Sequence, residues 1–138
     1  MAAATSIMRA QQLVSTKVDR ALRPLGLTFA RYEILMLLGF SRTGALPTTK
    51  MADRLMIHPT GVTKLIDKLE QQGLVRREPN PNDRRGTLVR ITPAGRRLSA
   101  KATRAVAEVR FGVDIDDAGL EKIVQSLTNF RKQSGDLS

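Results

Sequence analysis

The sequence contains no cysteine and no tryptophan, and only one histidine and one tyrosine among its 138 residues. A chain without cysteine has no disulfide framework, thiolate zinc site, iron–sulfur cluster or cysteine nucleophile. One histidine cannot supply a histidine metal cluster, so we expect neither a metal nor a cofactor. Four phenylalanines and one tyrosine are few for the base-stacking platforms of many RNA-binding modules, which argues against an RNA-binding function.

Long hydrophobic runs are also missing. The longest one, Ile34 to Leu38, is far shorter than the roughly 20 apolar residues that span a bilayer. The start, Met1 to Ala10, has no signal-type hydrophobic region. We therefore expect a cytoplasmic protein without a membrane partner. Nucleophile-elbow, P-loop and dinucleotide motifs are absent as well, so we expect no catalytic residues and no enzyme activity.

Basic residues are abundant and unevenly distributed. The chain carries 23 Lys and Arg against 13 Asp and Glu, a net charge of +10, while 41% of its residues are hydrophobic. It can therefore bury a core, and its charge belongs to a folded domain. The excess lies entirely in residues 1–99, because residues 100–138 hold six residues of each sign. A folded domain with this charge pattern indicates a polyanionic partner.

Hydrophobic periodicity predicts a mainly helical chain with a small sheet. We expect helices over residues 5–22, from the N-cap Thr28 onwards, from near Thr48, from Pro59 to Gly73, from the N-cap Thr92 to about Phe111, and from Asp116. In the fourth helix Val62, Leu65, Ile66 and Leu69 recur at intervals of three and four residues. They must face the core, which leaves a small, polar and basic outer face. Two short helices joined by a tight turn, the second with such a face, are typical of a helix-turn-helix.

A β-hairpin is predicted directly after this pair of helices. Residues 74–78 and 87–91 have strand composition, and residues 79–86 between them are rich in turn formers. The connecting segment contains Arg84 and Arg85, so the hairpin has a basic tip.

These features, in this order, resemble the MarR family of winged-helix transcriptional regulators. The resemblance is carried by "YEILMLL" at 32–38, "MADRL" at 51–55 and "VTKLIDKLEQQGLVRREPNPNDRRGTLVRITPAG" at 62–95. It implies a single domain over 1–138 with an α+β winged-helix fold. The DNA-binding lobe would occupy 46–92, and dimerisation helices would occupy 1–24 and 93–138. Gly61 departs from the family pattern, in which a residue with a side chain is more usual.

The resemblance also implies where DNA would be contacted. The helix from Pro59 would enter the major groove, and the wing tip would enter the minor groove, where arginine gains from the concentrated negative potential. Asp83 would hold the guanidinium of Arg85 or the loop around it. The implied DNA-contacting residues are Thr48, His58, Thr60, Gly61, Thr63, Lys64, Lys68, Arg84 and Arg85. Position 61 could serve by letting the backbone approach DNA closely.

Each of these assignments has a structural alternative. Lys64 and Lys68 could form a solvated helix face, the wing arginines could keep a sheet edge soluble, and His58 could be a plain turn residue. Asp114, Asp116 and Asp117 could bind a metal, but their position at a helix start favours capping. An effector pocket could include Phe29, Tyr32 and Met36, although such residues more often belong to a core.

The terminal helices predict a homodimer. Ile7, Val14 and Val18 at one end and Leu120, Ile123, Val124, Leu127 and Phe130 at the other would leave an apolar stripe exposed on a monomer. A two-fold dimer would bind double-stranded DNA at a pseudo-palindromic operator with half-sites roughly 10 bp apart. The resemblance implies a repressor released by a small phenolic or anionic effector. The alternative is a non-specific architectural DNA-binding protein, which would bind all duplexes with similar affinity.

Overall fold

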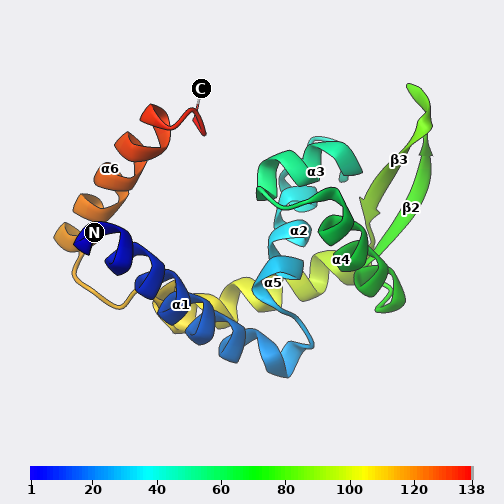
Figure 1. The fold of residues 1–138 in the computed structure, drawn as a ribbon. Helices are drawn as coiled ribbons and strands as arrows, with labels where there is room; N and C mark the ends of the chain where they lie inside the picture. The colour runs from blue at the N-terminus through cyan, green and yellow to red at the C-terminus, as the bar shows by residue number, and fades with distance from the viewer. Residues whose placement is uncertain (138) are drawn as a thin grey trace.

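A computed structural model of the chain describes residues 1–137. These residues form six α-helices, two short 3-10 helices and one three-stranded antiparallel sheet (Figure 1). The elements are α1 (Ala2–Leu22), η1 (Arg23–Leu25), α2 (Phe29–Phe40), β1 (Ala45–Pro47), α3 (Thr48–Leu55), α4 (Pro59–Gln71), β2 (Val75–Asn80), β3 (Asp83–Ile91), α5 (Pro93–Glu108), η2 (Arg110–Gly112) and α6 (Asp117–Gln133). The predicted mainly helical winged-helix fold is confirmed.

Side chains at the predicted N-caps fix where three helices begin. Thr28 Oγ1 accepts a hydrogen bond from Arg31 N, and Thr92 Oγ1 accepts one from Gly95 N at 3.0 Å. Asp116 Oδ1 accepts from Gly119 N at 2.8 Å. Each bond satisfies an N–H group that the first helical turn leaves unpaired. The predicted capping role of Asp116 is therefore confirmed.

The hairpin differs from its predicted form. Its strands reach Asn80 and Asp83, so the connecting turn contains only Pro81 and Asn82, and the predicted eight-residue loop is wrong. Arg84 and Arg85 consequently lie on the strand that leaves the turn. The short strand β1, which pairs with β3, was not predicted, because three residues ending in proline carry no periodicity.

The core lies where α2, α4, α5 and the sheet meet. Leu35, Leu38, Ile66, Leu69 and Val89 are all fully buried, and Val62 with the partly buried Leu65 completes the predicted inner face of α4. Gly95 brings α5 against the sheet, because a Cβ at this position would lie 2.2 Å from Leu74 O. Only glycine permits that approach.

The terminal helices extend away from this core. In Figure 1, α1 and α6 lie at the opposite end of the molecule from the β2–β3 hairpin. Residues of α6 are not buried, and Ile123, Val124 and Phe130 are 43%, 62% and 58% exposed. No helix in residues 1–137 has the length and apolar content needed to cross a membrane.

Two predictions about these helices are corrected. Val18 is 2% exposed and Val14 packs beside it on the core of its own chain, so neither belongs to an exposed stripe, whereas Ile7 is 46% exposed. The long helix ends at Glu108 and not near Phe111, because Arg110 and Phe111 take positive φ values of 50° and 53°. Residues with a left-handed backbone conformation cannot continue a right-handed helix.

Candidate nucleic-acid interface

The outer face of α4 carries most of the residues that sequence analysis assigned to DNA contact. Helical periodicity places Val62, Ile66 and Leu69 in the core, so the intervening residues point outward. Thr60, Thr63, Lys64 and Lys68 are accordingly exposed. Within residues 1–137, neither lysine forms a salt bridge. Their ammonium groups can therefore bind phosphates or base edges without breaking an existing pair.

His58 is the N-cap of α4, and its role there is more specific than a turn residue's. Its Nδ1 accepts a hydrogen bond from Thr60 N at 3.2 Å and lies 3.1 Å from Thr60 Oγ1. When Nδ1 accepts this bond, the ring N–H group is at Nε2. That N–H group stands beside the positive end of the helix, where anions are favoured.

Thr48 and Thr63 are brought together from α3 and α4. Both line a surface depression of about 240 Å³ that also includes Thr49, Asp53 and Pro59. Thr63 Oγ1 donates to Pro59 O at 3.1 Å, so its hydroxyl proton is engaged within the helix. Thr63 can still accept a hydrogen bond from DNA through its hydroxyl oxygen, or contact DNA through its methyl group.

Gly61 has no packing partner that would require a glycine. A Cβ at this position would meet nothing within 4 Å. Glycine in a helix costs about 1 kcal/mol relative to alanine, and no packing contact within residues 1–137 requires glycine here. Position 61 is thus an open patch of backbone on the face that carries Thr60 and Lys64.

Side chains at the wing tip form local hydrogen bonds to its backbone. Asp83 Oδ1 accepts from Arg85 N at 3.0 Å, and Asn80 Oδ1 accepts from Asn82 N at 3.0 Å. Asp83 therefore supports the loop backbone. The side chains of Arg84 and Arg85 are exposed at the end of a hairpin that projects beyond the helices (Figure 1).

Arg77 fixes the wing to α4, and sequence analysis did not identify it. Its guanidinium donates to Asp67 Oδ1 at 2.5 Å and Glu70 Oε1 at 2.8 Å, while its backbone N donates to Glu70 Oε2. Burial alone would lower the pKa of Arg77, but the hydrogen bonds to Asp67 and Glu70 outweigh this effect and raise it. The guanidinium therefore stays charged and links the wing to α4, the two elements that carry the candidate DNA contacts. Asp67 and Glu70, spaced i, i+3 on α4, were the sequence signal that could have indicated an ion pair here.

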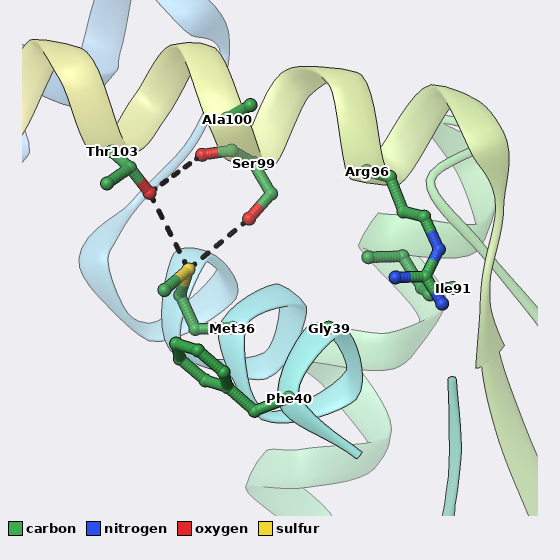
Figure 2. Close-up of a pocket in the computed structure, with 8 residues that line it drawn as sticks. All are labelled: Met36, Gly39, Phe40, Ile91, Arg96, Ser99, Ala100 and Thr103. Carbon is green, nitrogen blue, oxygen red and sulfur yellow. Dashed lines mark hydrogen bonds between the residues drawn. The ribbon is translucent and has the colours of Figure 1, made fainter. Parts of the chain in front are cut away.

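The three candidate effector residues do not share one cavity. Met36 lines a cavity of about 210 Å³ between α2 and α5, as Figure 2 shows. Tyr32 is 4% exposed and its hydroxyl lies 2.7 Å from Thr103 Oγ1, which is a core position. Phe29 is 36% exposed and is not among the cavity residues. Sequence analysis missed the other lining residues, which are Gly39, Phe40, Ile91, Arg96, Ser99, Ala100 and Thr103. Ser99 and Thr103 interrupt the apolar face of α5 and could have signalled the cavity.

Comparison with known proteins identifies the family. The model of the MarR family matches residues 27–87. The crystal structure of Sco5413, a MarR family transcriptional regulator from Streptomyces coelicolor, superposes with a TM-score of 0.94 and 46% identity over 100% of this chain and 96% of that one. The chain belongs to the MarR family. This membership confirms the predicted class, a DNA-binding transcriptional regulator and not an enzyme.

More distant relatives complete the comparison. The multiple antibiotic resistance protein MarR of Salmonella typhimurium is 32% identical over 87 residues, which are 60% of this chain and 59% of that protein. The chain thus matches about three fifths of the length of that relative. Some of the similar structures contain a bound partner. Sco3205 from S. coelicolor, in complex with DNA, is 23% identical (TM-score 0.80; 94% of this chain, 83% of that one). CouR from Rhodococcus jostii, bound to p-coumaroyl-CoA, is 28% identical (TM-score 0.76; 90% and 87%).

Proposed function

We propose that this MarR family member binds a pseudo-palindromic operator in double-stranded DNA as a homodimer and represses transcription from it. The observation that carries the proposal is the separation of surfaces in one small chain. Exposed basic and hydroxyl side chains gather on α4 and the wing tip, whereas exposed apolar side chains gather on α6. The first surface suits DNA and the second suits a second copy of the chain.

The dimer is supported by what α6 lacks. A 17-residue helix with no buried residue gains little tertiary packing, although packing supplies most of the stability of helices in proteins. Its apolar residues follow the spacing of a helix that packs along one face, and they are Leu120, Ile123, Val124, Leu127 and Phe130. Two-fold pairing would cover this face and hold two α4 helices at a fixed separation.

Control by a small molecule is a second part of the proposal. The CouR structure shows that a protein of similar fold can bind p-coumaroyl-CoA. Here the cavity between α2 and α5 offers an apolar wall from Met36 and Phe40 and polar groups from Ser99 and Thr103. A phenolic or anionic effector would release DNA only by binding more tightly to a dimer whose two α4 helices do not match the operator.

Alanine at Lys64 tests whether α4 reads sequence. We expect Lys64→Ala to lower operator affinity by about 1–3 kcal/mol per half-site and to change which base is preferred there. Thr63→Ala should shift preference with a smaller loss, because the Thr63 hydroxyl proton is already bonded to Pro59 O. Fluorescence anisotropy against operator duplexes with single base changes measures both effects.

Lys101→Ala is the matched control, because Lys101 is exposed on α5. It should leave both affinity and preference unchanged. If Lys64→Ala weakened binding to operator and scrambled duplexes equally, α4 would contact only the sugar-phosphate backbone of DNA. The alternative of a non-specific architectural protein would then be favoured.

A further inference from the structure

Three arginines converge at the base of the wing, away from the α4 face and the wing tip. Arg76 on β2 and Arg90 on β3 stand directly opposite each other in the antiparallel register. Arg96 comes from the first turns of α5. Together with Thr43, Gly44 and Thr92 they line a cavity of about 320 Å³. Like charges directly opposite on a sheet destabilise it unless something compensates.

One carboxylate supplies only part of this compensation. Glu78 Oε1 accepts from Arg76 Nε at 3.0 Å and from Arg90 Nε at 2.8 Å. The hydrogen bond from Arg90, together with that from Arg76, lowers the pKa of Glu78, so this residue is an anion near neutral pH. Arg76 and Arg90 thus share one carboxylate, and with Arg96 the cluster has two positive charges in excess.

Arg96 contributes one of these two uncompensated charges. No acidic group in residues 1–137 forms a salt bridge with it. Its guanidinium lies against the backbone of Gly44, where a Cβ would come within 2.6 Å of Nη2. Gly44 also has a φ of 74°, a conformation that glycine adopts readily. Position 44 therefore leaves room for the guanidinium beside the strand.

Arg90 connects the cluster to the rest of the lobe. Its Nη1 donates to Thr43 O at 2.8 Å, so one fork of the guanidinium is already engaged. Within residues 1–137 the bond from Arg76 to Glu78 uses only Nε, and no salt bridge engages the guanidinium of Arg96. Paired guanidinium forks match the geometry and charge of a doubly charged oxyanion such as a phosphate group.

The cationic cavity adjoins the apolar one between α2 and α5. Ile91 and Arg96 line both cavities. Figure 2 shows Arg96 at one end of the apolar cavity and Met36 with Phe40 at the other. A ligand that extends past Ile91 and Arg96 from one cavity into the other would place an apolar group beside Met36 and an anionic group among the arginines.

We propose that Arg76, Arg90 and Arg96 form a binding site for the phosphate group of a small molecule whose apolar part occupies the adjoining cavity. The site joins β2, β3 and α5, so a bound dianion would neutralise the arginine cluster and tie the base of the wing to α5. It is independent of operator recognition, which uses α4 and the wing tip.

Isothermal titration calorimetry with phenyl phosphate, without DNA, tests the site. Phenyl phosphate is mainly a dianion at pH 7.5, since the second pKa of a phosphate ester is near 6. We expect it to bind the full chain more tightly than inorganic phosphate does, and we expect phenol to bind weakest. Arg96→Gln and Arg76→Gln should each reduce phenyl phosphate affinity by about tenfold or more, because each removes a charged hydrogen bond to the phosphate. Both side chains are exposed, so melting temperatures should stay close to that of the wild type.

Arg97→Gln is the matched control, because Arg97 is the exposed neighbour of Arg96 on α5 and does not line either cavity. It removes the same charge and should leave phenyl phosphate affinity unchanged. Equal losses in Arg96→Gln and Arg97→Gln would reduce the effect to general electrostatics and overturn the site. A loss of DNA affinity in Arg96→Gln with phenyl phosphate binding unaffected would also overturn it, because the cluster would then hold a DNA phosphate.

Discussion

Replacing Arg85 by alanine is expected to weaken operator binding by roughly 30-fold while leaving the fold and the dimer unchanged. A side chain inserted in a groove contributes about 1 kcal/mol or more. A dimer loses two such contacts, and about 2 kcal/mol corresponds to this factor. Because Arg85 is exposed and Asp83 bonds only its backbone N, truncating its side chain breaks no contact within the wing.

The geometry of the wing tip strengthens this expectation. Asp83 and Asn80 hold the turn through backbone hydrogen bonds, and Arg77 braces the hairpin against α4. Arg85 is thus presented from a preorganised element, and less entropy is lost when it enters a narrow minor groove.

Gel-shift titration of wild-type and variant protein measures the effect, with Arg97→Ala as the control for loss of one surface arginine. A weaker dependence of affinity on salt concentration should accompany the loss, because fewer counterions are released. Unchanged affinity in Arg85→Ala would remove this residue from the interface. Arg84→Ala would then show whether its neighbour has the role instead.

Two acidic residues on the apolar face of α6 are expected to abolish the dimer. In the double variant Val124→Asp/Leu127→Asp, carboxylates would have to be buried where we place the two-fold contact. Each buried aliphatic side chain is worth about 1.5–3 kcal/mol, and symmetry counts each position twice. Sedimentation should show the variant at the 15.2 kDa mass of one chain, with the lobe as stable as in the wild type because α6 has no buried residue.

Loss of the dimer should affect DNA binding more than any single contact does. Linking two half-site modules raises affinity by a factor of about 10²–10⁴ through effective concentration. The monomeric variant should therefore bind the full operator only as tightly as one half-site. Gln125→Asp/Asn129→Asp adds the same charge to the polar face of α6 and should remain dimeric. A variant that stayed dimeric with Val124 and Leu127 replaced would place the dimer contact elsewhere.

Sequence patterns predicted the helices and the inner face of α4 because these depend on local signals. Threonine and aspartate caps, apolar residues at intervals of three and four, and Pro59 at a helix start all act within one turn. The prediction of Val62, Ile66 and Leu69 as core residues needed no tertiary information. The remaining residues of α4 then had to lie on the outer face.

Contacts between distant segments could not be predicted in this way. The i, i+3 pair Asp67 and Glu70 indicates a place for a cation on α4, but no local pattern shows that Arg77 occupies it. Nothing near Val18 in the chain shows that the core covers it. The wing turn was placed wrongly because its turn-forming residues also extend the strands, through the pair Asn80 and Asp83. The packing of α5 on the sheet requires glycine at position 95, and only the structure shows this, because it places Leu74 O where a Cβ would lie.

The central claim is that a homodimer reads two related half-sites, and selection of bound duplexes from a random-sequence pool tests it most directly. We predict enrichment of a pseudo-palindrome with half-sites roughly 10 bp apart, bound at least about 10³-fold more tightly than unselected DNA. Recovery of unrelated sequences with no enrichment, or of a single half-site without symmetry, would contradict the account.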